Sequence, residues 1–418
     1  RRPMSETKFP SQPTSADQIL DSITEMQKRD ADWRHGRLFS LIYHSESELE
    51  EVTKAAYMSC FSLNALSHGA FPSLARMEAE TIGMTADLLG QPGAPGSLTS
   101  GGSESNFLAL KTARDRMREV KPEIKEPEVI VPWSGHPSLS KASGYLGLKV
   151  VRADLDSEQR ADMASVRRSV TPNTILIVGS APSWPHGVVD PIVEMAKLAS
   201  SKGVMMHVDA CVGAFVLPFA KRLGRPVPEF DLTVDGVTSI SADIHKFGYT
   251  SKGASVILYK TDDIYAYQPF DFKDWTGGDY AVSTVLGSRP GGAVAAAWAT
   301  LRYLGLPGYL EMTRRALAAT QGFMDAVNSV EGFYVEGDPQ YNLFAFGSRD
   351  LDIKAVFVGL EEAGWHPLLQ GIPPSSLHLT LTPSHDRFAG DFRRDLREVA
   401  GRVQRGEISA EGVQARYN

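Results

Sequence analysis

Short, almost wholly apolar segments separated by stretches of helix length constrain this chain more than any other feature. The apolar segments are 129–131, 149–152, 174–178, 204–208, 237–241 and 255–259. Segments of helix length separate the first four, at 137–147, 161–169 and 191–201. This repetition, with strands that are apolar on both faces, is typical of a mostly parallel sheet covered by helices. We therefore predict an α/β fold whose ligands bind beyond the carboxyl ends of the strands.

The segments on either side of the predicted sheet differ in pattern. Before it, apolar residues at helical spacing predict three helices and then a Gly/Pro-rich loop, at 16–31, 46–58, 73–89 and 91–102. After it, two long helices at 292–304 and 308–327 lead into an alternating strand and helix tail. The tail comprises 333–335, 342–346, 351–363, 377–382 and 386–402. We predict an N-terminal helical segment (1–90), a large cofactor-binding α/β domain (91–305) and a small C-terminal α+β domain (306–418).

Charge and cysteine content argue against several classes of protein. The 418 residues include 43 Lys and Arg against 50 Asp and Glu, a net charge of −7, which disfavours nucleic-acid binding by phosphate neutralisation. Cys60 and Cys211 are too few for a disulfide framework or a zinc ribbon, so we expect reduced thiols. No apolar run reaches the roughly 18–20 residues that span a bilayer, and no signal-peptide pattern is present. We expect a cytoplasmic enzyme with no integral membrane segment and no metal.

Two glycine-rich turns precede predicted helices and are candidate anion sites. The first reads Ser-Gly-Gly-Ser-Glu-Ser at 100–105, before a helix at 106–120. Its glycines let the backbone approach an anion, and a helix N-terminus offers unpaired N–H groups. Taken alone, this turn is better explained as an ordinary glycine-rich turn with a serine N-cap, because Gly and Ser before a helix are common. The second turn reads Gly-Ser-Arg-Pro-Gly-Gly at 287–292.

An aspartate and a lysine follow neighbouring predicted strands. Asp209 ends a strand in His-Val-Asp-Ala, where a carboxylate is costly to bury unless a cation or a strong donor pairs with it. Lys246 follows the next strand in Ser-Ala-Asp-Ile-His-Lys-Phe-Gly. We expect its apolar and aromatic neighbours to lower the pKa of the amine, which suits a nucleophile. Taken singly, Asp209 is better explained as a turn cap and Lys246 as a surface lysine.

The first glycine-rich turn, Asp209 and Lys246 together match the three attachments of pyridoxal 5′-phosphate (PLP). The cofactor needs an anchored phosphate, a carboxylate that keeps the ring nitrogen protonated, and an amine that bonds its aldehyde. Other sites fit less well. The turn lacks the Gly-Lys-[Ser/Thr] ending of a P-loop, and no Gly-x-Gly-x-x-Gly follows the first strand, as a nicotinamide site requires. The histidines lack the spacing of a zinc site.

Longer segments around these motifs resemble the sphingosine-1-phosphate lyases, members of the group II PLP-dependent decarboxylase superfamily. The resemblance lies in 207–259 and in FPSLARMEAE, LTSGGSESNFLALKTARD, GSAPSWPHGVVDPI and GSRPGG, within residues 43–298. It implies a fold-type-I PLP-dependent transferase architecture, like that of aspartate aminotransferase. It also implies cleavage of phosphorylated sphingoid bases, such as sphingosine 1-phosphate, into a long-chain aldehyde and phosphoethanolamine. A homodimer with shared active sites is implied as well.

The resemblance assigns individual roles by position. Lys246 would bond the cofactor, with His245 beside it, Asp209 at the ring nitrogen and His136 stacked on the ring. The cofactor phosphate would be held by Gly102, Ser103 and Ser288, the last from the second subunit. The substrate would be bound by Tyr43, Asn64, His68, Lys252 and Tyr280. The candidates for the base that removes the hydroxyl proton are His245, the freed Lys246, Tyr249 and Tyr280.

Three positions depart from the family pattern, and two alternatives stay open. Ser103 replaces a threonine, His68 is displaced by one position, and Trp184 stands where a tyrosine or phenylalanine is expected. The nearest alternative is an amino-acid decarboxylase on the same fold, which would need an arginine for the substrate carboxylate, and Arg387 is the candidate. The second alternative is a non-catalytic scaffold, against which the intact Lys246 and Asp209 argue.

Overall fold

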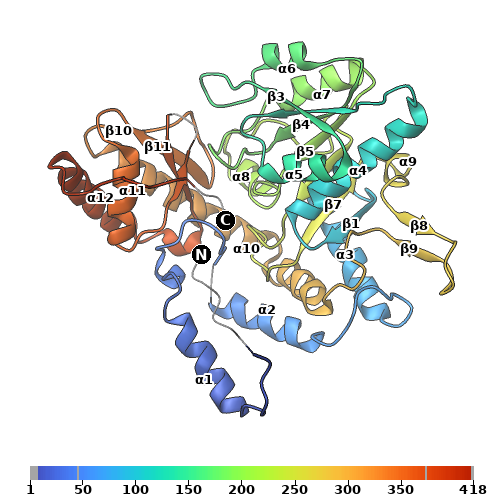
Figure 1. Ribbon diagram of the computed structural model, residues 1–418, viewed down its shortest axis with the longest axis horizontal. Helices are drawn as coiled ribbons and strands as arrows, with labels where there is room; N and C mark the ends of the chain where they lie inside the picture. The colour runs from blue at the N-terminus through green and yellow to red at the C-terminus, as the bar shows by residue number, and fades with distance from the viewer. Residues whose placement is uncertain (1–7, 45–46, 372–373, 416–418) are drawn as a thin grey trace.

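The computed structural model describes residues 8–44, 47–371 and 374–415, and a seven-stranded sheet forms the centre of its larger part (Figure 1). The strand order is β1-β7-β6-β5-β4-β2-β3. The strands are β1 (Gly96–Thr99), β2 (Glu128–Pro132), β3 (Lys149–Ala153), β4 (Thr174–Ser180), β5 (Met205–Asp209), β6 (Ser239–Ala242) and β7 (Ser255–Tyr259). β2 to β6 pair in parallel, and only β7 runs against its two neighbours. The predicted α/β fold with a mostly parallel sheet is confirmed.

β1 corrects the sequence prediction, which assigned the whole of 91–102 to a loop. Residues 96–99 pair with β7 at the edge of the sheet. Four residues that follow a Gly/Pro-rich turn give too short a pattern to separate a strand from a loop.

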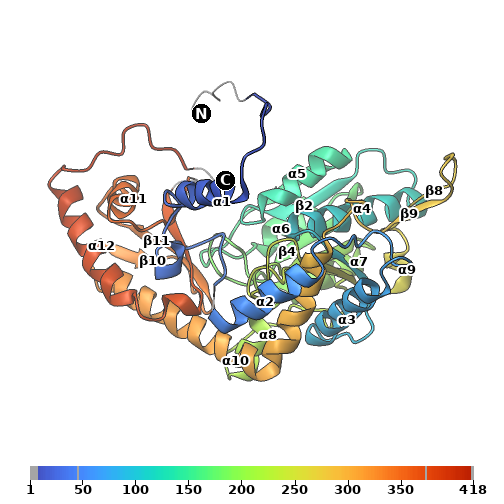
Figure 2. The same cartoon turned by 90° about the horizontal axis from the view of Figure 1, so that it is seen from below.

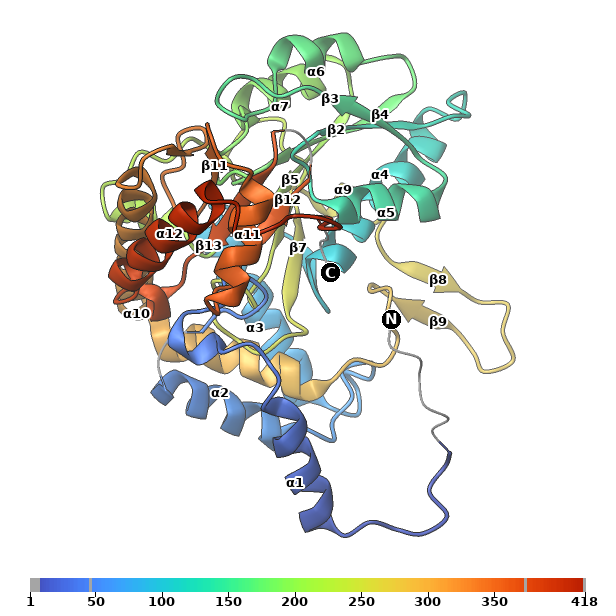
Figure 3. The same ribbon diagram turned by 60° about the vertical axis from the view of Figure 1, so that its left-hand side comes forward.

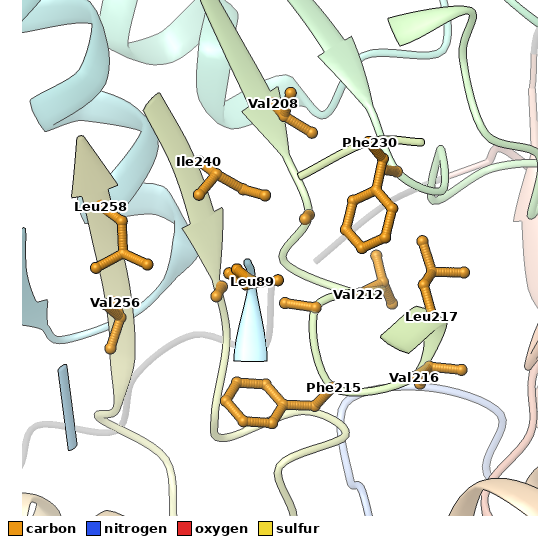
Figure 4. Packing of buried hydrophobic residues seen from close by; sticks show 14 of the residues in the cluster. Leu89, Val208, Val212, Phe215, Val216, Leu217, Phe230, Ile240, Val256 and Leu258 are labelled. Carbon is orange, nitrogen blue, oxygen red and sulfur yellow. The ribbon is translucent and has the colours of Figure 1, made fainter. Parts of the chain in front are cut away.

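Helices cover both faces of this sheet because its strands are apolar on both sides. α4 (Gly102–Val120) and α5 (Pro137–Leu146) pack on the face that carries Val129 and Val131. α3 (Pro72–Leu88), α7 (Ile192–Ser201) and α8 (Leu217–Arg222) pack on the face that carries Ile130. Figure 4 shows part of this second face, where Val208, Ile240 and Val256 lie in one buried cluster with Leu217 and its neighbours. The remaining short helices of this part are α6 (Met163–Ser169) and α9 (Asp262–Tyr265).

A second, antiparallel sheet forms the smaller C-terminal part, as predicted. Its strand order is β10-β11-β13-β12. The elements are β10 (Phe333–Val335), β11 (Leu343–Ser348), α11 (Ile353–Glu362), β12 (Leu368–Gln370), β13 (Ser376–Thr380), the 3₁₀ turn η2 (Pro383–His385) and α12 (Ala389–Gln404). The sequence pattern did not identify β12.

The long helix α10 (Gly291–Asn328) runs from the large part to the small one (Figure 2). It breaks at Gly305, whose φ of 51° and ψ of −169° are not helical, and Pro307 follows. A proline cannot continue a helix without losing a hydrogen bond, which is why two helices were predicted from the sequence. We propose that the domain boundary lies at this break.

Two segments project from the molecule (Figure 3). One is α1 (Ala16–Gln27), which has no buried residue. The other is the hairpin of β8 (Phe270–Phe272) and β9 (Tyr280–Val282), which the sequence pattern did not predict. Between α1 and the sheet lie the 3₁₀ turn η1 (Trp33–His35) and α2 (Ser47–Ser59), which packs on α10. No helix of the described residues is both long enough and apolar enough to cross a membrane.

Candidate active site

The carboxyl ends of β5 and β6 bring Asp209 and Lys246 to one cavity. The two strands are parallel, with Asp209 opposite Ser241, so both end at the same edge of the sheet. The turn after β6 then carries Lys246 back toward β5. The cavity has a volume of about 310 Å³. It is also lined by Gly102, Ser103, His136, Asp243 and His245.

The first turn of α4 forms one wall of this cavity. The helix begins at Gly102, not at residue 106 as predicted, because the glycine-rich turn itself is the start of the helix. A Cβ atom on Gly102 would lie 2.6 Å from Cys211 Sγ and 2.8 Å from Asp243 Oδ2, so only glycine fits there. The N–H groups of a first helical turn have no partner within the helix, and they carry a positive potential. This wall therefore suits a phosphate.

A buried hydrogen-bond network fixes Asp209. Asn106 Nδ2 donates to Asp209 Oδ2 at 3.0 Å, and the Cys211 backbone N–H donates to Oδ1 at 3.1 Å. His207 Nε2 lies 3.1 Å from Asn106 Oδ1, to which it donates. Burial alone would raise the pKa of Asp209, but His136 and Lys246 lower it below its usual value. Asp209 is therefore an ionised carboxylate, ready to face a cation.

The pKa of Lys246 is raised, whereas the sequence predicted that it would be lowered. Its side chain is 19 % exposed, and burial does disfavour the ammonium ion, as expected. Asp243 Oδ2, however, lies 3.0 Å from Lys246 Nζ, and this carboxylate leads the groups that raise the pKa well above its usual value. The apolar sequence neighbours are not the groups that surround the amine in space.

His136 presents a neutral ring to the cavity. It is the N-cap of α5, where its Nδ1 accepts from the Ser138 backbone N–H at 3.2 Å. Burial lowers the pKa of His136. A neutral, flat ring held at a helix start is suited to stacking on an aromatic ligand.

Tyr43 and Lys252 lie together next to Lys246. Lys252 Nζ is 4.7 Å from the centre of the Tyr43 ring and donates to the His245 carbonyl oxygen at 2.9 Å. Although Lys252 is partly exposed, desolvation of its ammonium group and then the charge of Lys246 lower its pKa to about 8. Tyr43 packs edge-on against Phe247. The two residues thus lie beside Lys246, although neither lines the cavity described above.

Four other predicted site residues do not line this cavity. Asn64 Nδ2 donates to Ser288 Oγ at 3.0 Å, and His68 Nε2 lies 3.2 Å from Glu78 Oε2. Tyr280 belongs to the projecting hairpin. Arg289 makes paired hydrogen bonds to the buried Glu78, at 2.9 and 3.0 Å, and its backbone N–H donates to Asn64 Oδ1 at 3.2 Å.

Two further candidates lie outside the cavity lining. Tyr249 is buried, and burial strongly raises its pKa, so the phenol keeps its proton. Arg387, the candidate carboxylate-binding residue of a decarboxylase, is exposed and stacks over Phe388.

Sequence reasoning missed three polar residues of the site: Asn106, Glu104 and Asp243. Glu104 accepts from the Ser100 and Val285 backbone N–H groups, each at 2.7 Å. All three residues lie within or next to motifs that the sequence singled out. Their only signal in the sequence is that an acidic or amide side chain lies within four residues of each motif. That nearness in sequence does not show which group the side chain contacts in the folded chain.

A second cavity of about 780 Å³ adjoins the first, because Trp184 lines both. Trp184 stacks on His378 of β13 with the ring centres 4.1 Å apart. Leu155, Pro185 and Trp133 give the second cavity apolar walls. Trp184 thus separates a polar cavity from a larger, more apolar one.

The residues of the first cavity fit PLP. The N-terminus of α4 at Gly102 offers backbone N–H groups for a phosphate, Asp209 offers a carboxylate, and Lys246 offers an amine, all on one cavity. Cys211 is buried, and burial raises its pKa, so it is a thiol and not a competing nucleophile.

Comparison with known proteins gives consistent similarities. The family model of the pyridoxal-dependent decarboxylase conserved domain matches residues 1–349. A sphingosine-1-phosphate lyase of Oryza sativa subsp. japonica is 40 % identical over 399 residues, covering 93 % of this chain and 73 % of the relative. A probable L-aspartate decarboxylase of Pyrococcus furiosus is 32 % identical, covering 86 % and 94 %. Among solved structures, a Burkholderia pseudomallei sphingosine-1-phosphate lyase superposes with a TM-score of 0.90 and 34 % identity, covering 96 % and 94 %.

Proposed function

The chain belongs to the sphingosine-1-phosphate lyases of the pyridoxal-dependent decarboxylase family, and from this premise we propose that it is a PLP-dependent carbon–carbon lyase. It cleaves phosphorylated sphingoid bases, such as sphingosine 1-phosphate, into a long-chain aldehyde and phosphoethanolamine. One observation carries the proposal: an amine, an ionised carboxylate and a helix N-terminus line a single cavity. When bound there, PLP supplies a ring that accepts the electron pair of the broken bond.

Each residue of the cavity has a defined task in this proposal. The first turn of α4, with Gly102 and Ser103, binds the cofactor phosphate. Asp209 would keep the ring nitrogen protonated, and Asn106 keeps that carboxylate oriented. His136 would lie against the ring, and Lys246 would bond the aldehyde. His245 fixes the turn, since its Nδ1 accepts from the Ala254 backbone N–H at 3.3 Å.

Of the four candidate bases, we assign the hydroxyl proton to the freed Lys246 amine. Tyr249 lies outside the lining of the cavity, and Tyr280 lies on the hairpin. His245 lines the cavity, but its Nδ1 is taken up by Ala254 and its Nε2 is directed at Asp243. Lys246 faces the cavity and has a high proton affinity once neutral. An amine of high pKa is a strong proton acceptor.

The substrate extends in two directions from the cavity. Tyr43 and Lys252 bind the substrate phosphate beside Lys246. The phenol and the ammonium group can each donate a hydrogen bond to a phosphate oxygen. The second cavity, beyond Trp184, has room and apolar walls for the hydrocarbon chain. Each methylene buried there contributes about 0.8 kcal/mol to binding.

We also propose a homodimer with shared active sites. Asn64, His68, Tyr280 and Ser288 gather outside their own chain's cavity, and the exposed hairpin beside them carries aromatic side chains. If a second copy covers the hairpin of the first, these four residues of the first copy would lie at the cavity of the second copy. The cytoplasmic location stays a prediction.

A product assay tests the proposed function. Incubation of the PLP-loaded protein with sphingosine 1-phosphate should release a long-chain aldehyde and phosphoethanolamine in equal amounts. Lys246→Ala should lower this activity at least about 10³-fold and abolish the visible absorption of the attached cofactor. Lys221→Ala, at an exposed position of α8, is the matched control and should change neither. Release of carbon dioxide from an amino acid without any aldehyde would instead assign the chain to the decarboxylases.

A further inference from the structure

Asp243 is a buried carboxylate of the cavity to which no role has been assigned so far. It follows β6 directly and is 1 % exposed. Its Oδ2 lies 3.0 Å from Lys246 Nζ and 3.5 Å from His245 Nε2. Its other oxygen, Oδ1, is buried and has no hydrogen-bond partner among the described residues. A buried, half-satisfied carboxylate costs free energy, so its presence calls for a physical explanation.

The position of Asp243 makes this cost larger. The Cβ position of Gly102 lies 2.8 Å from Asp243 Oδ2 and 2.9 Å from Oδ1, so the carboxylate packs against the first turn of α4. That turn is where the cofactor phosphate is proposed to bind. A carboxylate next to a phosphate repels it unless a cation lies between them. Lys246 is the cation in contact with Asp243.

Charged and titratable groups from several elements face Lys246. They are Asp243 and His245 on its own turn, Asp209 and Cys211 after β5, Tyr43 in the N-terminal segment, His136 at the start of α5, Glu104 on α4 and Lys252 before β7. Asp209 turns its two oxygens toward Asn106 and the Cys211 backbone, whereas Asp243 turns Oδ2 toward the amine. Burial would raise the pKa of Asp243, but Lys246 and then His245 lower it far below its usual value. Asp243 is thus a permanent anion beside the amine.

We propose that Asp243 is a positioning residue that docks the Lys246 side chain in its ammonium form. The freed lysine is a neutral amine when the substrate amine has displaced it, and it becomes the docked ammonium ion when it accepts the hydroxyl proton. The ion pair holds the lysine beside the reacting centre and stabilises that proton on it. This inference rests on the proposed function for the role of Lys246.

Competitive labelling of the full chain without cofactor tests this role. Cyanate carbamylates only neutral amines, so the rate at Lys246 against pH, read by peptide mass spectrometry, gives the pKa of that amine. In the unaltered chain this pKa should exceed that of the partly exposed Lys354, which serves as internal reference. Asp243→Asn should lower it by at least one unit and so speed labelling of Lys246 at pH 8 about tenfold.

Asp209→Asn is the matched control, because it removes a second buried carboxylate of the same cavity. Its effect on the rate at Lys246 should be clearly smaller than that of Asp243→Asn, since Asp209 makes no ion pair of 4 Å or less with the amine among the described contacts. Equal effects of the two variants, or an unchanged rate in Asp243→Asn, would overturn the docking role. A Lys246 pKa below that of Lys354 in the unaltered chain would overturn it without any variant.

Two further measurements distinguish a failure of the docking role from misfolding of the variant and from a wrong substrate. Circular dichroism shows whether Asp243→Asn folds, and Asp243→Ser, which also removes the charge, replaces it if it does not. Neither cofactor nor substrate is present during labelling. If the product assay fails but the Lys246 pKa is high, the proposed substrate is wrong and the ion pair stands. If the product assay succeeds but the Lys246 pKa is low, the proposed function stands and the docking role of Asp243 is wrong.

Discussion

At the scale of single residues, Lys252 ionises much closer to neutral pH than an ordinary lysine does. Its pKa is lowered to about 8 by desolvation and by the neighbouring Lys246. Below pH 8 the ammonium ion is present, and above pH 8 it is lost. The substrate phosphate is a dianion above about pH 6. We therefore predict that kcat/KM, which reports the free enzyme, falls above about pH 8 and approaches a tenfold loss per pH unit.

Lys252→Arg separates this residue from the other groups that titrate. A guanidinium stays charged throughout the range, so this variant should show no fall near pH 8 that is due to residue 252. The measurement is the pH profile of product formation at low substrate concentration. Identical profiles for the two proteins would mean that Lys252 does not bind the phosphate.

The sequence was enough to single out Lys246 and Asp209 as candidates for one site, but it was not enough to predict the direction of the Lys246 pKa. The motifs pointed to Lys246 and Asp209 because few chains carry both after neighbouring strands of a parallel sheet. The direction of the Lys246 pKa was wrong, because the amine meets Asp243 across a turn and not the apolar residues next to it in sequence. Such a contact depends on the path of the turn, which a pattern of residue types does not specify.

At the scale of elements, Glu104 joins the start of α4 to the loop that leads from β9 to α10. It is 8 % exposed and accepts from the backbone N–H groups of Ser100 and Val285 at 2.7 Å and of Leu286 at 3.3 Å. Glu104→Ala leaves these partly buried donors without this partner. We predict a loss of about 2–4 kcal/mol in the free energy of unfolding, together with weaker PLP binding because the phosphate-binding turn loosens.

The matched control is Glu119→Ala, which removes an exposed carboxylate from the other end of the same helix. Its unfolding free energy in urea and its dissociation constant for PLP, measured by fluorescence titration, should stay close to those of the unaltered chain. If Glu104→Ala behaved like this control, the link between the helix and the loop would contribute little.

The elements that the sequence predicted are those with strong periodicity. β2 to β7 and the main helices were found within a few residues because buried parallel strands and amphipathic helices leave distinct patterns. β1, β8, β9 and β12 were missed, and each has only three or four residues. Such short strands exist because a neighbouring strand pairs with them, and pairing partners are not visible in local sequence.

At the scale of the whole molecule, α1 and the β8–β9 hairpin expose large apolar side chains to solvent. Ile19 and Leu20 of α1 and Phe270 and Trp275 of the hairpin are each 46–61 % exposed. Apolar surface of this kind marks a contact with another molecule. In the proposed dimer, the second copy covers this apolar surface. Ser288 would then reach the cofactor phosphate in the second copy's cavity, which accounts for its absence from the lining of its own chain's cavity.

Co-expression of two differently tagged inactive variants tests whether the sites are shared. Lys246→Ala removes the amine, and Ser288→Asp places a negative charge where the partner's cofactor phosphate would bind. In a mixed dimer, the cavity of the Ser288→Asp chain keeps Lys246 and receives an unaltered Ser288 from the other chain. Half of randomly assembled dimers are mixed and each has one intact site, so we predict about a quarter of the unaltered activity.

Purification through both tags isolates the mixed dimer, whose activity should then approach half that of the unaltered protein. Light scattering should show twice the mass of one chain, and Tyr145→Ser, at an exposed aromatic residue on α5, is the matched control that should leave this mass unchanged. Replacement of both Phe270 and Trp275 by serine should lower the mass toward that of one chain and the activity with it, because an uncovered hairpin no longer holds the second copy. Mixed dimers with no activity would mean that Ser288 serves its own subunit, since only a cavity completed in trans can regain function from two chains that are each inactive.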